Sequence, residues 1–189
     1  GNVTAVVVGN VSEEVAKELG NYGADQIVIA NNPVLTTFNA QNYANALVAI
    51  ANNNSANTIV LPFDIAGKAL APILSAKMKA GLVAGAVAFP VNDGGSVVKK
   101  SVFSSKAFAY VKVTSENKII SVITNSHPVE MMEKSATVST FADAPNATNN
   151  VTKVSEDVLK GEVPLAEAEL VVSGGRGLKG PENWGMIEE

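Results

Sequence analysis

Cysteine is absent from this sequence of 189 residues, and histidine occurs once, as His127. The first absence excludes disulfides, zinc–thiolate sites, iron–sulfur ligation and a thiol nucleophile, and a single histidine argues against a histidine-based metal site. No apolar run reaches the roughly 18 residues of a transmembrane helix. The first residues also lack the charged and apolar segments of a signal peptide. We therefore expect a cytoplasmic protein without a metal site and without stable membrane insertion.

Charged residues are scarce as well, at 17% of the chain, and they leave a formal net charge of −4. This composition has no basic footprint, so we expect no nucleic-acid partner. Hydrophobic residues make up 47%, which is enough for a packed core. The length fits one ordinary domain and a fragment of a second.

The first half of the chain alternates short apolar runs with amphipathic segments of helical spacing. Val3–Val8 is almost continuously β-branched, which is typical of a strand covered on both faces. Ser12 and Asp64 stand where they can cap helices, and Pro72 predicts a bend or a restart in the helix after Asp64. Such alternation predicts an α/β fold with a parallel sheet and helices on both of its faces. The predicted strands are Val3–Val8, Gln26–Ala30, Thr58–Pro62 and Ala86–Pro90.

The second half changes to short strands separated by turn residues, with no helical segment between them. We predict that these strands form an antiparallel addition to the sheet. Asp143 to Val154 is polar and is expected to be a linker or a surface crossing, and a short helix is expected over Val154–Lys160. The strands of this addition are Ser96–Ser104, Phe108–Val113, Lys118–Thr124 and Ser135–Thr140.

The closing segment predicts a strand, a glycine-rich turn and the start of a helix. Glu169–Ser173 is the strand, the glycines of the turn satisfy G-x-G-x-x-G up to Gly180, and Pro181 suits a first helical position. Such a turn lets backbone N–H groups approach a pyrophosphate. A lone match is weak, and no second strand follows with the acidic ribose ligand of a dinucleotide fold. Arg176 suits a pyrophosphate or an electron-rich flavin edge, and the alternative is a solvated loop cation.

The segment "VVSGGRGLKGPENW" (Val171–Trp184) resembles the start of the flavin-binding domain of electron transfer flavoprotein alpha subunits. The resemblance extends more loosely to "GKALAP" (Gly67–Pro72) and to "KSVFSSKAFAYVKV", and it covers essentially the whole chain. It implies that residues 1–167 form the family's N-terminal domain, a Rossmann-like, adenine nucleotide alpha hydrolase-like sheet. It also implies that residues 168–189 are the truncated start of the C-terminal FAD-binding domain. The chain departs from the family's usual residues at Ile73, Gly85, Ser105, Lys106 and Ser139.

The resemblance further implies that the first strand and helix of the family's N-terminal domain are not in this sequence. That strand would be central in the sheet, so its absence would expose the edges of both neighbouring strands. We expect either upstream residues or another element to fill this position.

The function implied by the resemblance is an electron carrier and not an enzyme with its own substrate. The alpha and beta subunits of this family hold one FAD, which takes electrons from acyl-CoA-type dehydrogenases and passes them to a downstream acceptor. Arg176 would lie beside the flavin, and Gly174, Gly175 and Gly177 would allow close backbone approach. No catalytic residue is predicted, and the fragment alone is expected to bind no stoichiometric FAD.

Two other interpretations stay open at this point. The chain could be an adenine-nucleotide-binding α/β module without redox function, although the loop "FDIAGK" after the third strand has one glycine. The N-terminal region could also act only as a scaffold that offers a surface to partners. Lys99, Lys100 and Lys106 could then lie on a contact face, but solvated strand charges explain them more simply.

Overall fold

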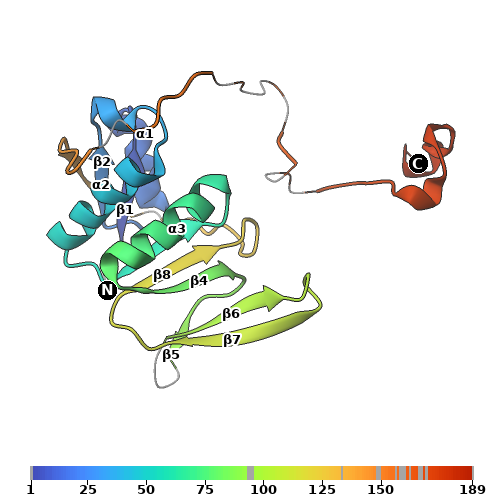
Figure 1. The fold of residues 1–189 in the computed structure, drawn as a ribbon, viewed down its shortest axis with the longest axis horizontal. Coiled ribbons are helices and arrows are strands. Elements are labelled where there is room, and N and C mark those ends of the chain that lie inside the picture. Colours follow the sequence, from blue (N-terminus) through green and yellow to red (C-terminus); the bar gives the residue numbers. More distant parts are fainter. Residues whose placement is uncertain are drawn as a thin grey trace. The chain divides into compact units, whose positions relative to one another are not determined.

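The computed structural model describes residues 2–92, 96–132, 134–147, 150–155, 157, 161, 163–165, 168 and 170–188. The chain divides into two compact units, Gly1–Val154 and Ser155–Glu189. The first unit holds the sheets and the long helices (Figure 1).

The first sheet contains three parallel strands in the order β1-β2-β9. They are β1 (Thr4–Val8), β2 (Gln26–Ala30) and β9 (Thr137–Phe141). Between β1 and β2 lie helix α1 (Glu13–Lys17) and a 3-10 turn, η1 (Glu18–Tyr22). The Ser12 side chain accepts a hydrogen bond from the backbone N–H of Val15, so its predicted capping role is confirmed.

The second sheet has the order β3-β8-β4-β6-β5, and β7 pairs with β6. The strands β3, β8 and β4 are parallel, whereas β5, β6 and β7 pair antiparallel. The predicted fold class is therefore confirmed: a parallel sheet flanked by helices, with an antiparallel addition. The strand bounds are β3 (Thr58–Pro62), β4 (Gly81–Ala86), β5 (Val91–Asn92), β6 (Ser96–Val102), β7 (Ala107–Val113) and β8 (Lys118–Val122).

Three strand predictions were wrong in detail. The fourth strand lies at Gly81–Ala86 and not at Ala86–Pro90. The prediction missed it because glycine and alanine are poor strand formers, although the segment lies between β8 and β6. β8 and β9 were expected in the antiparallel addition, yet both pair parallel. After the β6–β7 hairpin the chain returns to insert β8 between β3 and β4, and it then crosses to β2. This return depends on contacts between distant segments, which local sequence patterns do not reveal.

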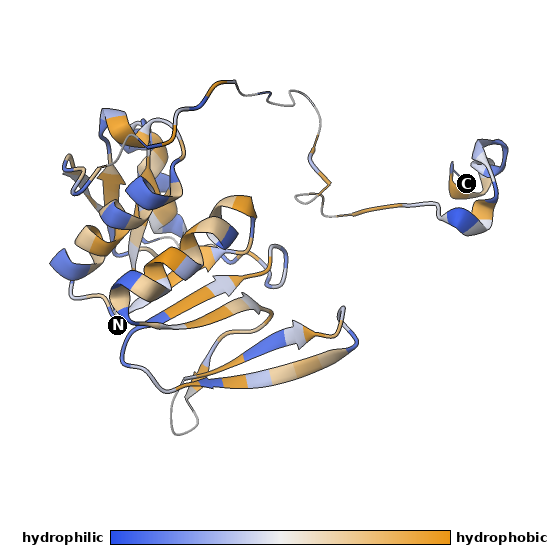
Figure 2. Ribbon diagram, viewed as in Figure 1, coloured by the Kyte–Doolittle hydropathy of each residue, from blue (hydrophilic) through white to orange (hydrophobic). Residues whose placement is uncertain are grey.

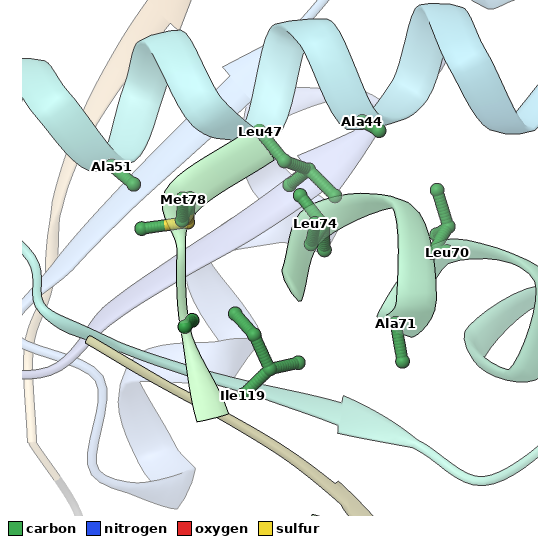
Figure 3. Close-up of a cluster of buried hydrophobic side chains, with 9 residues drawn as sticks. Ala44, Leu47, Ala51, Leu70, Ala71, Leu74, Met78 and Ile119 are labelled. Carbon is green, nitrogen blue, oxygen red and sulfur yellow. The ribbon is translucent and has the colours of Figure 1, made fainter. Parts of the chain in front are cut away.

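Helices α2 (Ala40–Asn53) and α3 (Ile65–Met78) pack against each other, and η2 (Pro33–Leu35) precedes α2. Leu47 of α2, Leu74 of α3 and Ile119 of β8 belong to one buried cluster (Figure 3). The hydropathy colouring shows apolar residues along α3 and on the strands of the second sheet (Figure 2). Asp64 caps α3 as predicted, because its carboxylate accepts from the Gly67 N–H at 2.6 Å. The helix continues through Pro72, which faces solvent, so of the two predicted alternatives, a bend or a restart, the restart is excluded.

A groove of about 210 Å³ separates the edges of β1 and β3. Among the described strands, β1 pairs only with β2 and β3 pairs only with β8. All of β1 is half-buried, so the prediction that both of its faces are covered was wrong, and Val60 of β3 is 62% exposed. The groove is lined by Thr4, Ala5, Val6, Thr58, Ile59, Val60 and Leu61 of the two strands, by Leu47, Ile50 and Ala51 of α2, and by Asn54 and Ala56 after this helix.

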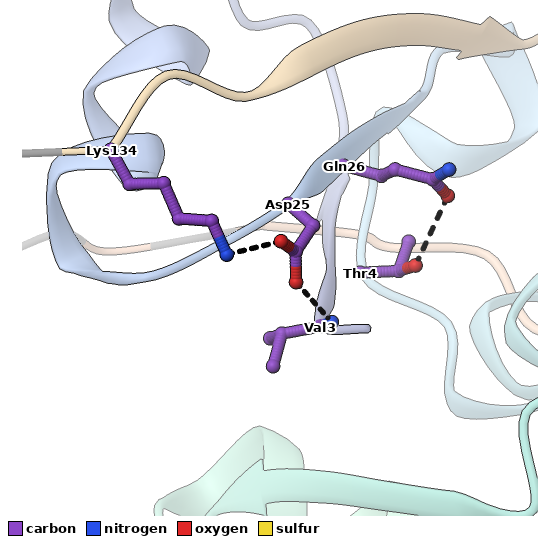
Figure 4. A network of polar contacts seen from close by, with 5 residues as sticks. All are labelled: Val3, Thr4, Asp25, Gln26 and Lys134. Atoms are coloured by element: carbon purple, nitrogen blue, oxygen red, sulfur yellow. Dashed lines mark hydrogen bonds and ion pairs between the residues drawn. The ribbon is translucent and has the colours of Figure 1, made fainter. Parts of the chain in front are cut away.

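A polar network joins the starts of the first-sheet strands (Figure 4). The Asp25 carboxylate accepts a hydrogen bond from the Val3 N–H at 2.7 Å and forms an ion pair with Lys134. The hydrogen bond from Lys134, followed by that from Val3, lowers the pKa of Asp25. Thr4 donates to the Gln26 side chain at 3.4 Å.

Candidate functional site

The glycine-rich turn lies in the second unit and consists of short helical turns. They are η3 (Arg176–Leu178), η4 (Pro181–Asn183) and helix α4 (Gly185–Glu188). Pro181 opens η4, as predicted for a first helical position. The predicted strand Glu169–Ser173 was wrong over its described residues 170–173, which have no strand partner within the described part of this unit. Most of the predicted helix Val154–Lys160 lies outside the described residues.

The turn is held by its own backbone and by one amide side chain. The Leu178 N–H donates to the Gly175 carbonyl at 3.0 Å, and the Lys179 N–H donates to the Arg176 carbonyl at 3.2 Å. The Asn183 side chain donates to the Leu178 carbonyl at 2.8 Å, so it joins η3 to η4. Sequence analysis assigned no role to Asn183, although it lies inside the diagnostic segment "GPENW".

The glycines of this turn fall into two groups, according to what a side chain would meet. A Cβ at Gly174 would lie 2.3 Å from Leu178 Cδ1 and 2.7 Å from Trp184 Cζ3, so local packing explains this glycine. A Cβ at Gly175 or Gly177 would meet nothing within 4 Å. Gly175 also has an extended backbone, with φ −106° and ψ −172°, which any residue adopts. Neither local packing nor backbone conformation therefore requires glycine at 175.

Next to these glycines is a shallow pocket of about 360 Å³ that carries two cations, Arg176 and Lys179. Both side chains are exposed, and none of the described lining residues is a carboxylate. Of the predicted site residues, Gly174, Gly175 and Arg176 come together here, whereas Gly177 lies in the turn but does not line the pocket. The arrangement offers open backbone and positive charge, which suits an anionic or electron-rich ligand. The lining residues are Gly174, Gly175, Arg176, Leu178, Lys179, Gly180, Pro181 and Trp184.

The other glycine considered for nucleotide binding, Gly67 at the start of α3, has a structural explanation. A Cβ there would lie 1.8 Å from the Pro62 carbonyl oxygen and 3.3 Å from the Asp64 carboxylate. This glycine allows α3 to begin directly against the end of β3. It leaves no open backbone for a phosphate, so this loop does not support the adenine-nucleotide interpretation.

Other candidate residues have structural surroundings of their own. The His127 ring stacks on Phe89 with centroids 4.1 Å apart, and its buried Nε2 makes no hydrogen bond within the described residues. Met131 and Met132 are exposed. The part of the chain that the structure describes has no group of three or more His, Cys, Asp or Glu residues that could hold a metal ion.

The fold defines a class of protein: an α/β domain in which parallel strands are flanked by helices and carry an antiparallel addition, and a glycine-rich turn follows it in the chain. A family model described as "Electron transfer flavoprotein domain" matches residues 1–146. The chain therefore belongs to the electron transfer flavoprotein family, as its sequence resemblance indicated.

Curated relatives match the whole length of this chain, including the glycine-rich turn. The electron transfer flavoprotein subunit alpha of Bacillus subtilis is 28% identical over 193 residues, which cover 100% of this chain and 59% of that protein. The protein of the same name from Syntrophomonas wolfei is 29% identical, over 99% of this chain and 60% of its own length. That from Thermoanaerobacterium thermosaccharolyticum is 26% identical, over 100% and 59%. The chain thus spans about three fifths of the length of these relatives.

Within the described residues, every helix is too short or too polar to cross a membrane.

Proposed function

We propose that this chain is part of the alpha subunit of an electron transfer flavoprotein. In the intact protein, electrons from acyl-CoA-type dehydrogenases would pass through a bound FAD to a downstream acceptor. The observation that carries the proposal is the glycine at position 175, which neither its neighbours nor its backbone conformation requires. A ligand that approaches the backbone closely would explain why no side chain is present there.

The proposed roles follow from the chemistry of the turn. The bound FAD supplies the redox chemistry, and the protein supplies binding, orientation and electrostatics. Open backbone at Gly175 and Gly177 allows the ligand to come close, while Gly174 lets Trp184 and Leu178 pack behind the turn. The guanidinium of Arg176 would favour the reduced, negatively charged ring over the oxidised one, which would raise the reduction potential. This is a carrier, so no residue is assigned as a catalytic acid or base.

We propose that residues 1–167 form the N-terminal domain and residues 168–189 begin the FAD-binding domain. The first compact unit ends at Val154, a short distance before this boundary. The pocket at the turn is shallow, and the described residues that line it lie within 174–184. The rest of the FAD site would come from further polypeptide and from a companion beta subunit, so residues 1–189 alone are expected to remain colourless.

The experiment that tests this proposal measures flavin bound to the intact alpha polypeptide, produced together with its companion subunit. Gly175→Val places a branched side chain where the structure has open space, and it is expected to abolish flavin absorbance near 450 nm. Gly185→Val is the matched control, because a Cβ at Gly185 also meets nothing within 4 Å and this glycine does not line the pocket. Full flavin content in Gly175→Val, or a colourless unsubstituted protein, contradicts the proposal.

A further inference from the structure

The middle of the glycine-rich turn has a backbone conformation that is rare for a residue with a side chain. Lys179 has φ 66° and ψ −33°, and the Gly180 N–H donates to the Leu178 carbonyl at 2.8 Å. A hydrogen bond between residues i and i+2 around a central residue of this kind forms a γ-turn of the rare, strained type. Lys79, at the end of α3, also has a positive φ, but its φ of 50° and ψ of 43° lie in the ordinary left-handed region. Lys179 lies outside that region, so its conformation costs free energy.

A side chain from the next helical turn holds this γ-turn closed. The Leu178 carbonyl accepts a second hydrogen bond, from Asn183 Nδ2, also at 2.8 Å. The backbone N–H of Asn183 donates to the Gly180 carbonyl at 3.2 Å. Asn183 is therefore bonded to both ends of the γ-turn, and its hydrogen bonds offset part of the cost of the strained residue between them.

The strained position holds lysine, although glycine would adopt the same conformation without steric cost. The turn is otherwise rich in glycine, so a lysine at this position points to a use for its side chain. Lys179 is exposed and lines the shallow pocket together with Arg176. Strain that persists in a folded protein concentrates at functional sites. We therefore expect the ammonium group of Lys179 to have a partner that is not part of this turn.

The two cations of the pocket differ in chemistry, and this difference separates their roles. The proposed function places Arg176 at the flavin ring, and a planar guanidinium suits a flat ring. The ring is anionic only when it is reduced, whereas the pyrophosphate of FAD is charged in every redox state. A lysine ammonium is a compact point charge that binds phosphate. A phosphate group is therefore the partner that the chemistry of Lys179 fits best.

We propose that Lys179 binds a phosphate group of the flavin cofactor, and that Asn183 positions Lys179 by holding the γ-turn closed. The inference rests on the proposed function, which supplies the cofactor. Lys179 is then the residue by which this turn distinguishes phosphorylated flavin from free riboflavin. Asn183 acts only through the Leu178 carbonyl, so it is a positioning residue and not a ligand contact.

A purely structural role does not explain Lys179. The bonds that close the γ-turn come from backbone groups and from the Asn183 amide, and none of them uses the lysine side chain. The ion pairs among the described residues lie in the first unit, so none of them neutralises Lys179. The Glu182 carboxylate lies against Gly180, yet it forms no ion pair with Lys179. The strained residue thus contributes to this turn only an uncompensated positive charge beside the pocket.

The test uses the intact alpha polypeptide with its companion subunit, stripped of flavin and titrated with FAD and with riboflavin, which has the same ring and no phosphate. Lys179→Met is expected to raise the Kd for FAD about tenfold and to leave that for riboflavin within about twofold. Lys179→Arg keeps the positive charge and should retain most of the FAD affinity. Lys79→Met is the matched control, because it removes another exposed lysine with a positive φ and should change neither Kd.

Two further variants separate binding from folding. Lys179→Gly relieves the backbone strain, so the Tm should stay the same or rise while FAD affinity falls as in Lys179→Met. Asn183→Ala is expected to raise the Kd for FAD about fivefold in the wild type. In the Lys179→Met background the same change should have less than about a twofold effect, because both residues act through one contact. Thermal unfolding verifies that each variant is folded.

Wild-type FAD affinity in folded Lys179→Met overturns the proposal. Equal losses for FAD and riboflavin also overturn it, because they place the lysine at the ring. An effect of Asn183→Ala that is as large in Lys179→Met as in the wild type overturns the positioning role. The inference and the proposed function fail in different ways. An unsubstituted complex that binds no flavin refutes the proposed function, whereas a yellow complex insensitive to Lys179→Met refutes the phosphate contact alone.

Discussion

Alanine at Gly67 and alanine at Gly175 are expected to have opposite consequences, because the space around the two glycines differs. At Gly67 the new methyl group would lie 1.8 Å from the Pro62 carbonyl oxygen, well inside the 3.0 Å that real Cβ atoms keep. Backbone at the β3–α3 junction would have to move. Alanine improves helix propensity by about 1 kcal/mol. Overpacking against the backbone exceeds this gain, and we expect a net loss of about 2 kcal/mol.

At Gly175 the methyl group meets nothing within 4 Å and the backbone is extended. The free energy of unfolding should therefore change by less than about 0.5 kcal/mol. In the intact protein, the same methyl group would lie where the flavin approaches. We expect the Kd for flavin to rise about tenfold, which corresponds to an overlap of about 1.4 kcal/mol.

The assay measures each substitution twice, by thermal unfolding of residues 1–189 and by flavin titration of the intact protein with its companion. Gly67→Ala should lower the Tm by roughly 4–8 °C, given about 2–4 °C per kcal/mol for a unit of this size. Its folded fraction should bind flavin normally. Gly175→Ala should keep the Tm and lose flavin affinity. The reasoning is refuted if Gly175→Ala lowers the Tm as much as Gly67→Ala does, or if it binds flavin with unchanged affinity.

Three further predictions concern the stability of the first unit. Leu74→Ala removes a fully buried side chain of α3, so it should lower the free energy of unfolding by about 3 kcal/mol and the Tm by roughly 6–12 °C. Ile65 lies on the same helix and is 88% exposed, so Ile65→Ala should change the free energy of unfolding by less than about 0.5 kcal/mol. Equal effects of the two variants would contradict the described core. Asp64→Ala removes the cap of α3 and should lower the free energy of unfolding, measured in urea, by about 1 kcal/mol. Asp64→Asn should retain most of the capping stabilisation. An unchanged urea midpoint in the alanine variant would argue against the cap. Asp25 has a lowered pKa in the folded state, so its contribution to stability is present above about pH 4 and is lost as the pH falls through the folded pKa. The stability difference between wild type and Lys134→Met should therefore shrink below about pH 4. A difference that stays constant with pH would contradict the ion pair.

Local signals in the sequence were sufficient for much of the fold. β2 and β3 have the predicted bounds, because each is a short apolar run between clear turn residues. Ser12 and Asp64 cap their helices, because a capping side chain acts within three residues of its own position. These elements depend on contacts between close neighbours in the chain.

The strand order could not be predicted in the same way. β8 inserts between β3 and β4, and β9 joins β2, after the hairpin has taken the chain away from the parallel strands. β4 was predicted at Ala86–Pro90, but it lies at Gly81–Ala86 between two strands, and its glycine and alanine residues have low strand propensity. Both errors concern pairing between distant segments, which no local pattern contains.

For the candidate site, the sequence motif located the turn and Arg176, but it could not rank the glycines. Gly67, Gly174 and Gly175 look equivalent in a sequence. In the folded protein, other atoms occupy the side-chain positions of Gly67 and Gly174, whereas the position at Gly175 is open. Asn183 also joins η3 to η4, through a hydrogen bond that depends on how the turn folds back.

The most direct measurement of the central claim is the reduction potential of flavin in the intact complex, compared between wild type, Arg176→Lys and Arg176→Met. If Arg176 lies beside the flavin ring, Arg176→Met should lower the two-electron potential by at least about 30 mV, a tenfold change in equilibrium constant. Arg176→Lys should stay closer to the wild-type value. A potential that is the same in all three proteins would contradict the placement of this arginine at the flavin.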